Sequence, residues 1–434
     1  MFAACLAAGD KGTVYSDGDE LCNGICYGFQ IGGNIICSII LASFMGMAGI
    51  ILGSVVGNAL GILTCLWHYF RKVNTLHFVW HLSFRDFLLT SRYSIVDSSV
   101  YICWGLMDYV MIGFVASHYG ESSLITLAVV VSLIEFAVVM DGVGMALQPL
   151  IGTYFGEGNH QLIRRVMKSG VKAAVVEGLI ATLFIWVFAE QFCALFGVTG
   201  GPTLLPTITA LRIVSLGFTF CSLVSLTTSY YMLIDHIRMA TCIACLHNGI
   251  LYTLLPMLGS FAFGINGMWA GFAAAPMLTL ACAYLFVYLR FGKDNFPFLL
   301  KDMGSEIEVL DDTLTPQAAA ELSERVGSTL LSRGYSNKTA LRASLFVEEM
   351  GLSILEANKD AKKPVLIELS LFFDPDSVLI IQRDSGKLFD IANPDQEIQS
   401  INRTILDGIL SSLNEKAYLV TTGYNRHMVR FTQD

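Results

Sequence analysis

Long apolar runs, each sufficient to cross a bilayer, dominate the first 290 residues of this 434-residue chain. A run of about 20 apolar residues crosses the hydrocarbon core as a helix, because a helix satisfies its own backbone hydrogen bonds there. The charged fraction of 15% and the mean hydropathy of +0.59 exclude an ordinary soluble protein. We therefore predict a polytopic α-helical membrane bundle. About eight runs qualify: 24–44, 46–69, 93–116, 124–152, 172–197, 204–232, 239–262 and 266–290.

One glycine pattern occurs twice, each time between two apolar runs. Residues 44–53 read FMGMAGIILG, and residues 262–271 read AFGINGMWAG. Apart from the run that each copy directly follows, about four apolar runs of the same lobe precede the second copy, whereas almost none precedes the first. Internal repeats of helix bundles are how many transporters are built. The pattern predicts one complete bundle preceded by the tail of another. The coinciding glycines are Gly46 with Gly264, Gly49 with Gly267, and Gly53 with Gly271.

These repeats divide the membrane part into three predicted segments. Residues 1–70 are a remnant of a first lobe with about two spans, and residues 93–292 are a second lobe with six. Residues 71–92 form a cytoplasmic connector, and the mixed polar and apolar pattern of His81–Arg92 favours a helix on the membrane surface.

The positive charges predict the orientation. An even number of spans places both termini on one side of the membrane, and nearly all lysines and arginines of the first 293 residues fall on that side; only Arg212 falls toward the other. By the positive-inside rule that side is cytoplasmic. We predict a multi-pass protein of the cytoplasmic (plasma) membrane, in contact with the lipid bilayer, with both termini in the cytoplasm.

A polar region follows the apolar one. Residues 301–434 carry 14 Lys and Arg and 21 Asp and Glu, out of 27 and 36 in the whole chain. We predict a linker at 293–312 and a domain at 313–434, an α+β sandwich with helices on one face of an antiparallel sheet. Its negative charge argues against a nucleic-acid partner. The expected helices are 317–332, 338–358 and 398–413, and the expected strands are 365–373, 377–383, 416–422 and 426–431.

All 11 cysteines precede residue 300, mostly within apolar runs. Cys242 and Cys245 have CxxC spacing, but no second pair or histidine cluster accompanies them. We interpret the cysteines as small hydrophobic residues of membrane helices.

The stretch Gln148–Asn159, QPLIGTYFGEGN, carries a resemblance to a known family. Its Gln-Pro and its glycine-asparagine loop resemble the multidrug and toxic compound extrusion (MATE) transporters, and the two glycine turns look like that family's turn between the last two helices of each half. The match covers residues 24–292, about helices five to twelve of twelve, so the first four are missing. The resemblance implies export of an organic small molecule coupled to Na⁺ or H⁺ through a cavity between two lobes.

Acidic residues inside apolar runs are the candidates for cation, proton or substrate contact, because charge at membrane depth is costly. Glu135 lies in the middle of its run and is the first candidate; Asp141, Asp108 and Asp97 follow. The 11 residues between Asp97 and Asp108 place both near one helix face. Glu177 and Arg212 are expected at the ends of their runs, at the membrane interface.

The C-terminal domain resembles the GHKL fold of anti-sigma-factor kinases and histidine-kinase ATP-binding domains. Glu349 matches the catalytic glutamate of the family's first motif, where Ser353 replaces the asparagine that coordinates Mg²⁺. Asp384 and Gly386 match the turn that binds adenine. The later phosphate loop, expected near Asn402–Leu410, has a single glycine. The resemblance implies a degenerate ATPase or kinase domain that binds ATP, with little support for Mg²⁺.

Three functions follow from these resemblances. The first is a MATE-type secondary transporter regulated by its GHKL-like domain. The second is a membrane-tethered signalling protein whose GHKL-like domain binds nucleotide or a regulatory protein. The third is a truncated product of a full twelve-helix transporter gene. The intact second lobe favours the first, and the short first lobe favours the other two.

Overall fold

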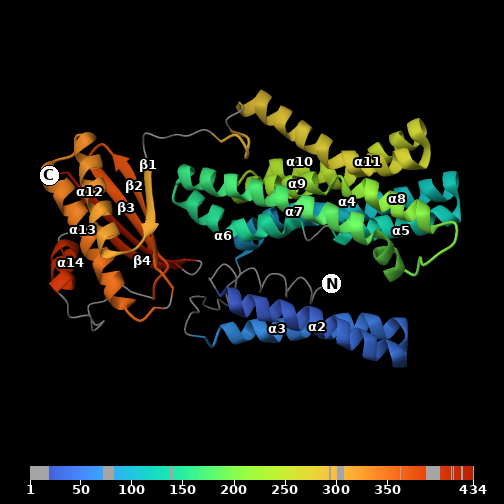
Figure 1. The fold of residues 1–434 in the computed structure, drawn as a ribbon, viewed down its shortest axis with the longest axis horizontal. Coiled ribbons are helices and arrows are strands. Elements are labelled where there is room, and N and C mark those ends of the chain that lie inside the picture. Colours follow the sequence, from blue (N-terminus) through green and yellow to red (C-terminus); the bar gives the residue numbers. More distant parts are fainter. Residues whose placement is uncertain are drawn as a thin grey trace. The chain divides into compact units, whose positions relative to one another are not determined.

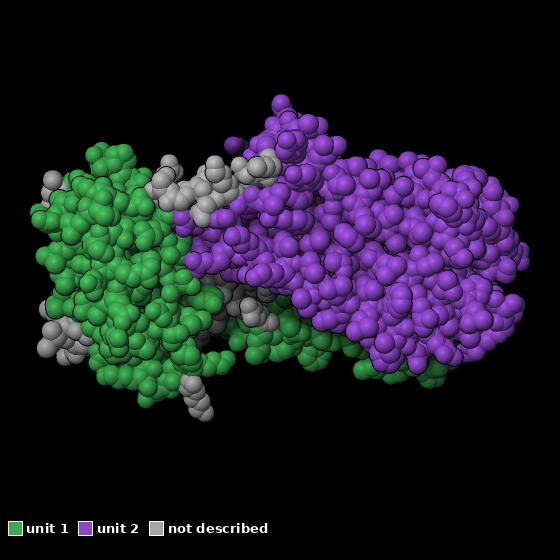
Figure 2. Space-filling view, turned by 45° about the horizontal axis from the view of Figure 1, so that its top comes forward, with its two compact units in different colours: residues 1–79, 303–434 green, residues 80–302 purple. Residues whose placement is uncertain are grey.

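The computed structural model describes residues 19–71, 83–136, 140–292, 295–300, 307–361, 363–387, 401–411, 413, 415–421 and 424–433. The chain divides into two compact units, one of residues 80–302 and the other of residues 1–79 with 303–434 (Figure 2). Three parts are visible: a helical hairpin, a helix bundle and an α+β domain (Figure 1). Each is described by itself.

The hairpin consists of α2 (Glu20–Met45) and α3 (Met47–His68), which pack against each other along their length. Gly46 joins them with φ +58° and ψ −134°, a conformation open only to glycine. Backbone of α2 lies so close to Gly49 and Gly53 that a Cβ at either position would overlap it. The three glycines therefore let the chain reverse within one residue and keep the two helices close.

The second glycine turn has the same geometry. Gly264, with φ +67° and ψ −154°, interrupts the long helix α11 (Tyr252–Phe291). A Cβ at Gly267 would overlap the carbonyl of Gly259, eight residues earlier, just as one at Gly49 would overlap that of Leu41. The repeat in the sequence is therefore a repeat of one backbone turn.

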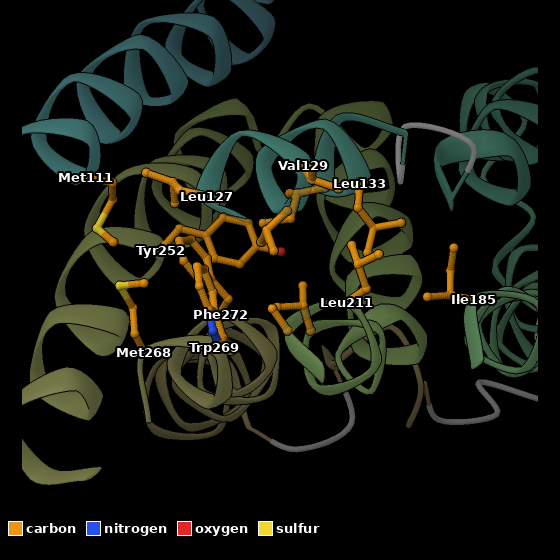
Figure 3. Packing of buried hydrophobic residues seen from close by; sticks show 14 of the residues in the cluster. Met111, Leu127, Val129, Leu133, Ile185, Leu211, Tyr252, Met268, Trp269 and Phe272 are labelled. Atoms are coloured by element: carbon orange, nitrogen blue, oxygen red, sulfur yellow. The ribbon is translucent and has the colours of Figure 1, made fainter. Parts of the chain in front are cut away.

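Residues 80–302 form the bundle, whose core is drawn in Figure 3. Trp269 and Phe272 of α11 pack there with Leu127 of α5. Two polar pairs also join helices across the bundle: Trp104 donates to Asn248 at 2.8 Å, and the Thr126 and Thr207 hydroxyls are 2.9 Å apart. The helices not yet bounded are α4 (Phe84–Tyr119), α5 (Glu121–Phe136), α6 (Gly142–Gly156), α7 (His160–Leu195), α8 (Leu204–Ser215), α9 (Phe218–Leu233) and α10 (Ile237–Cys245), with a π-helix at Leu246–Leu251.

The bundle is as apolar outside as inside, with large side chains such as Ile180, Leu183 and Phe263 exposed, which suits a surface solvated by lipid. Within the described residues, five helices are long and apolar enough to cross a membrane, and α8 with α9, bent by 44°, makes a sixth candidate. The longest candidate, Ile237–Phe291, contains the Gly264 turn and so comprises two of the predicted runs. The chain is a multi-pass membrane protein; the count of eight stays a prediction.

The connector predicted at 71–92 needs a correction. Residues 72–82 lie outside the described part, but α4 begins at Phe84, capped by Ser83, and continues to Tyr119. Nothing in the sequence between Phe84 and Ser94 breaks a helix, so the expected surface helix is in fact the first turns of α4.

The C-terminal part is the expected α+β sandwich. An antiparallel sheet in the order β1-β2-β3-β5-β4 has helices on one face (Figure 1). Apolar residues between helices and sheet make its own core, among them Phe346, Met350, Ile380 and Phe431. Its elements are β1 (Ile307–Thr313), α12 (Pro316–Ser332), α13 (Asn337–Ala357), β2 (Leu366–Asp374), β3 (Ser377–Asp384), α14 (Ile401–Ser411), β4 (Lys416–Thr421) and β5 (Tyr424–Thr432).

The predicted strands and helices of this domain are confirmed, but its start is not. Strand β1 falls within the predicted linker 293–312 and pairs with β2 from Ile307 to Thr313. The sequence did not indicate this strand because Glu308, Asp311 and Asp312 interrupt its apolar pattern. A strand at a sheet edge tolerates such residues, since it needs little apolar alternation.

The contact between α7 and α9 at Gly178 yields a first prediction. A Cβ on Gly178 would overlap the Thr219 backbone. Replacing Gly178 with Ala forces the helices apart and should destabilise the bundle by about 1–3 kcal/mol, measured as a lower thermal midpoint in detergent. Gly113→Ala is the matched control, since nothing lies within 4 Å of that helical glycine; equal midpoints in both variants would contradict the prediction.

Candidate functional site

Glu177 is a half-buried acidic residue at a contact between helices. It stands near the middle of α7, and Ser222 of α9 donates a hydrogen bond to its Oε2 at 2.9 Å. Its Oε1 lies beside Gly142, at the start of α6. The carboxylate of Glu177 thus lies where α6, α7 and α9 meet.

The break between α5 and α6 supplies further polar groups. Helix α5 ends at Phe136 and α6 begins at Gly142, with a short 3₁₀ turn at Met140 and Asp141. Ser225 of α9 interacts with the Asp141 carboxylate, and the Met140 carbonyl lies 3.4 Å from the Ser222 hydroxyl. Broken helices of this kind expose backbone carbonyls that can coordinate a cation.

The carboxylates of this region influence one another. Asp141 interacts electrostatically with both Glu177 and Asp97 of α4. Neighbouring carboxylate charges repel one another, so the arrangement favours a cation or a proton among them. Asp97 itself is exposed, and Asp141 and Glu177 are half-buried.

Asp108 and Glu135 form a separate pair between α4 and α5. They interact electrostatically, and a buried oxygen of the half-buried Asp108 has no hydrogen-bond partner. Glu135, the first candidate from sequence, is exposed on this bundle and sits one residue from the end of α5. Asp97 interacts with Asp141, and Asp108 with Glu135; their position near one helix face stays a prediction.

An apolar pocket of about 530 Å³ adjoins Glu177. Its walls come from α5, α7 and α9, and Glu177 is its one ionisable residue. A pocket of this size with a single carboxylate fits a small organic molecule that is apolar and carries positive charge. Other residues of the wall include Phe136, Met140, Ile180, Phe184 and Phe218.

Sequence reasoning placed Glu177 at the end of its apolar run, at the membrane interface, and that depth stays a prediction. Helix α7 begins at His160, before the apolar run predicted at 172–197, and ends at Leu195. Glu177 is therefore 17 residues from one end and 18 from the other. The glycine that follows it, Gly178, was the available signal, because a small residue marks a close helix contact.

The C-terminal domain has its own polar site. The sheet face that meets the helices is apolar at Ile380 and Val429 but polar further along, where it presents Gln382 and Asp384 of β3 and Asn425 and His427 of β5. All four are at most 1% exposed. These four buried polar residues at the end of the sheet are called the polar floor below.

Asp384 is the centre of that floor. Its Oδ1 accepts hydrogen bonds from the Gly386 N–H at 2.9 Å and from the Asn425 amide at 2.8 Å. Its Oδ2 lies 3.5 Å from His427 Nε2. The chain therefore forms a turn at Asp384 and Gly386, and the Asp384 Oδ1 atom already accepts two hydrogen bonds from the protein.

Helix α13 closes the floor. Asn358, at its end, accepts a hydrogen bond from the Lys387 N–H at 2.9 Å, which ties the helix to the turn at Gly386. Glu349 and Ser353 are buried on the same helix, and Glu349 Oε2 and Ser353 Oγ have no hydrogen-bond partner. Burial raises the pKa of Glu349, and the nearby Glu348 carboxylate adds to the rise.

Unpartnered buried groups need an explanation, because each costs about 1–3 kcal/mol. Among the described residues, the two side-chain amide atoms of Gln382 also have no hydrogen-bond partner, like Glu349 Oε2 and Ser353 Oγ. A polar ligand between α13 and the floor would satisfy them. The phosphate loop expected near Asn402–Leu410 is instead part of helix α14, Ile401–Ser411, and residues 388–400, which follow the predicted adenine turn, lie outside the described residues.

Comparison with known proteins agrees with the architecture of the membrane part. Residues 98–264 match the MatE family model. A crystal structure of MATE in complex with MaL6 is similar, with a TM-score of 0.59 and 15% identity over 66% of each chain. An outward-facing multidrug resistance MATE family transporter of the MOP superfamily has the same score and identity, over 65% of this chain and 64% of the other.

A MOP superfamily transporter from Pyrococcus furiosus is also similar, with a TM-score of 0.56 and 16% identity over 63% of each chain. This chain thus spans 66% or less of the length of these structures. No curated protein matches it. At such identities the likeness defines the fold: the membrane part has the fold of MATE transporters.

Proposed function

We propose that this protein is a secondary transporter that exports an organic cation in exchange for Na⁺ or H⁺. The observation that carries the proposal is Glu177, a carboxylate near the middle of the long helix α7 that is hydrogen-bonded to Ser222 and lines an apolar pocket. The MatE match and the MATE-like fold support it. Asp141 and Asp97 complete the group of acids.

The mechanism follows from charge. A carboxylate in a low-dielectric pocket attracts one positive charge strongly, because water does not screen it. Substrate and coupling ion then compete for Glu177 and Asp141, and occupancy by one weakens binding of the other. Such competition is the basis of exchange, since each ion that enters displaces the cation that leaves.

Removing the Glu177 charge tests this proposal. In vesicles containing the full chain, Glu177→Gln should reduce uptake of a fluorescent organic cation, driven by a Na⁺ or proton gradient, to the level of empty vesicles. Glu190→Gln, on the exposed surface of the same helix, should transport like the wild type. Wild-type transport by Glu177→Gln would contradict the role of Glu177, and the same assay on Glu135→Gln and Asp108→Asn tests the second acidic pair.

The orientation of the chain in the membrane is part of the proposal, with the C-terminal domain in the cytoplasm. A cysteine placed at Ser328, exposed on α12, should resist an impermeant thiol reagent added outside intact cells. A cysteine at Thr199, in the loop between α7 and α8, should react under the same conditions. Labelling of the Ser328 position above the background of the native cysteines would reverse the assigned topology.

For the C-terminal domain we propose regulation of transport through a weakly bound nucleotide or a partner protein. The buried floor around Asp384 suits adenine, which offers an amino group to a carboxylate. Phosphate contacts are weak by comparison: Ser353 stands where the resemblance implies a metal-binding asparagine, and charge-assisted contacts of that kind contribute about 1.5–3 kcal/mol each.

Calorimetric titration of residues 307–434, which include β1 and an independent core, tests this second function. ATP should bind weakly or not at all, Mg²⁺ should add little affinity, and hydrolysis should be undetectable. Asp384→Ala should remove whatever binding exists, while Asp376→Ala, in the exposed β2–β3 turn, should not change it. Tight Mg²⁺-dependent binding, or phosphate release lost in Glu349→Ala, would instead identify a working ATPase or kinase.

A further inference from the structure

The C-terminal domain holds hydrogen-bonding groups that the described part of the chain leaves unused. They belong to the polar floor or to helix α13, and each residue is at most 9% exposed. The atoms without a hydrogen-bond partner are Glu349 Oε2, Ser353 Oγ, Gln382 Oε1 and Nε2, and Asp384 Oδ2. Leaving one such atom unpaired costs about 1–3 kcal/mol, so a group of them points to a ligand.

Two contacts show that these atoms belong to one region. At one end of α13, Phe346 packs on Phe431, which pairs with Val378 of β3. At the other end, Asn358 accepts a hydrogen bond from the Lys387 N–H, just past the end of β3. The unpartnered groups of the helix and of the strand lie between these two contacts along each element. Helix and strand therefore bring them to the same place.

Gln382 has a buried amide without a structural task in the described chain. Its neighbours on the helix face of the sheet are Leu369 of β2 and His427 of β5. The side chain is 0% exposed, and neither its oxygen nor its nitrogen has a hydrogen-bond partner. An apolar residue would fill the position without the cost of a buried unpaired amide. The amide therefore indicates recognition of something outside the described chain.

Asp384 offers a ligand one oxygen instead of two. Its Oδ1 accepts hydrogen bonds from the Gly386 N–H and the Asn425 amide, whereas its Oδ2 has no hydrogen-bond partner among the described residues. A guanine base presents a ring N–H and an amino group side by side, which suit both oxygens of a carboxylate. An adenine amino group needs a single acceptor. The one open oxygen therefore favours adenine over guanine.

The Gln382 amide complements that oxygen. A glutamine amide pairs with adenine through two hydrogen bonds, because its oxygen accepts from the amino group and its N–H donates to N7. Gln382 and Asp384 are two residues apart on one face of β3, so their Cα atoms are roughly 6.6 Å apart. Both side chains are therefore within reach of one base.

The charges around the floor disfavour phosphate. Burial and the nearby Glu348 carboxylate raise the pKa of Glu349, so negative charge is already costly beside it. The buried arginine of β3, Arg383, points to the opposite face of the sheet and pairs with Glu368 at 2.6 Å. Within the described part, the buried residues of α13 and of the polar floor include no lysine or arginine. A triphosphate would add negative charges here without a countercharge, whereas a nucleoside adds none.

We propose that the polar floor binds an uncharged adenine nucleoside, with Gln382 as the second residue that reads the base. This inference rests on the nucleotide regulation proposed above and narrows its ligand to a nucleoside. Asp384 Oδ2 accepts one hydrogen of the adenine amino group, and Gln382 pairs with the other hydrogen and with N7. The absence of phosphate leaves the Glu349 carboxyl group unopposed.

The simpler interpretation is that ordered water satisfies these groups. Water explains a single unpaired atom such as Ser353 Oγ. It does not explain why the donor and the acceptor of one amide stand beside a carboxylate with one engaged oxygen, on the same strand face. A binding experiment separates the two interpretations.

Calorimetric titration of the full chain in detergent tests the ligand, with adenosine, guanosine, and ATP with and without Mg²⁺ as probes. We expect one equivalent of adenosine to bind. Guanosine and both forms of ATP should bind about 10-fold more weakly than adenosine, a loss typical of one mismatched buried polar group.

Matched variants locate the site. Gln382→Leu should weaken adenosine binding about 10-fold, and it should raise the thermal midpoint of the unliganded protein because it removes an unpaired buried amide. Glu349→Gln should raise the affinity for ATP toward that for adenosine and leave adenosine binding unchanged. Glu324→Gln, exposed on α12, is the control and should change neither affinity.

The possible failures are distinguishable. Tighter binding of Mg²⁺-ATP than of adenosine would overturn the nucleoside inference and leave the proposed nucleotide regulation standing. Unchanged adenosine affinity in Gln382→Leu, or equal affinity for guanosine, would overturn the role of Gln382. If no purine binds and Gln382→Leu still raises the midpoint, the floor holds ordered water only, and both this inference and nucleotide regulation are wrong.

Discussion

Close packing of helix backbones is the constraint on which the membrane part depends. Lipid is as apolar as the helix surfaces, so burying a leucine between helices gives little stabilisation. Helix association therefore depends on van der Waals packing between closely spaced helices. Glycine provides that contact at Gly49 and Gly53 in the hairpin, at Gly267 in α11 and at Gly178 in α7. At the last of these the consequence is chemical as well, because the same approach of α7 to α9 brings Glu177 to Ser222.

The sequence was sufficient for the elements that repeat or alternate. The glycine turns at Gly46 and Gly264 were recognisable because only glycine reaches their positive φ, and four strands of the C-terminal sheet followed from alternation. Strand β1 was missed because an edge strand carries little pattern. The prediction of a separate surface helix before α4 was wrong, because the polar residues in the first turns of α4 have the pattern of a surface helix.

The site was harder to predict than the fold, for a physical reason. Whether an acidic residue matters depends on what faces it, and a single helix does not contain that information. Glu135 has the more apolar neighbours in sequence yet is exposed, whereas Glu177 has basic residues nearby and still meets α6 and α9. In the C-terminal domain the motif residue Asp384 was correctly placed in a buried turn, but its partner Asn425 comes from a strand 41 residues away.

The site around Glu177 in the bundle and the site around Asp384 in the C-terminal domain carry charge in different ways. Asp384 has one carboxylate oxygen held by two fixed donors of the protein, the Gly386 N–H and the Asn425 amide. Glu177 accepts one hydrogen bond from Ser222 and faces an apolar pocket with Asp141 nearby. A carboxylate without a fixed countercharge in a low dielectric must take one from the solution. That difference is why we assign exchange of cations to Glu177 and recognition of an adenine amino group to Asp384.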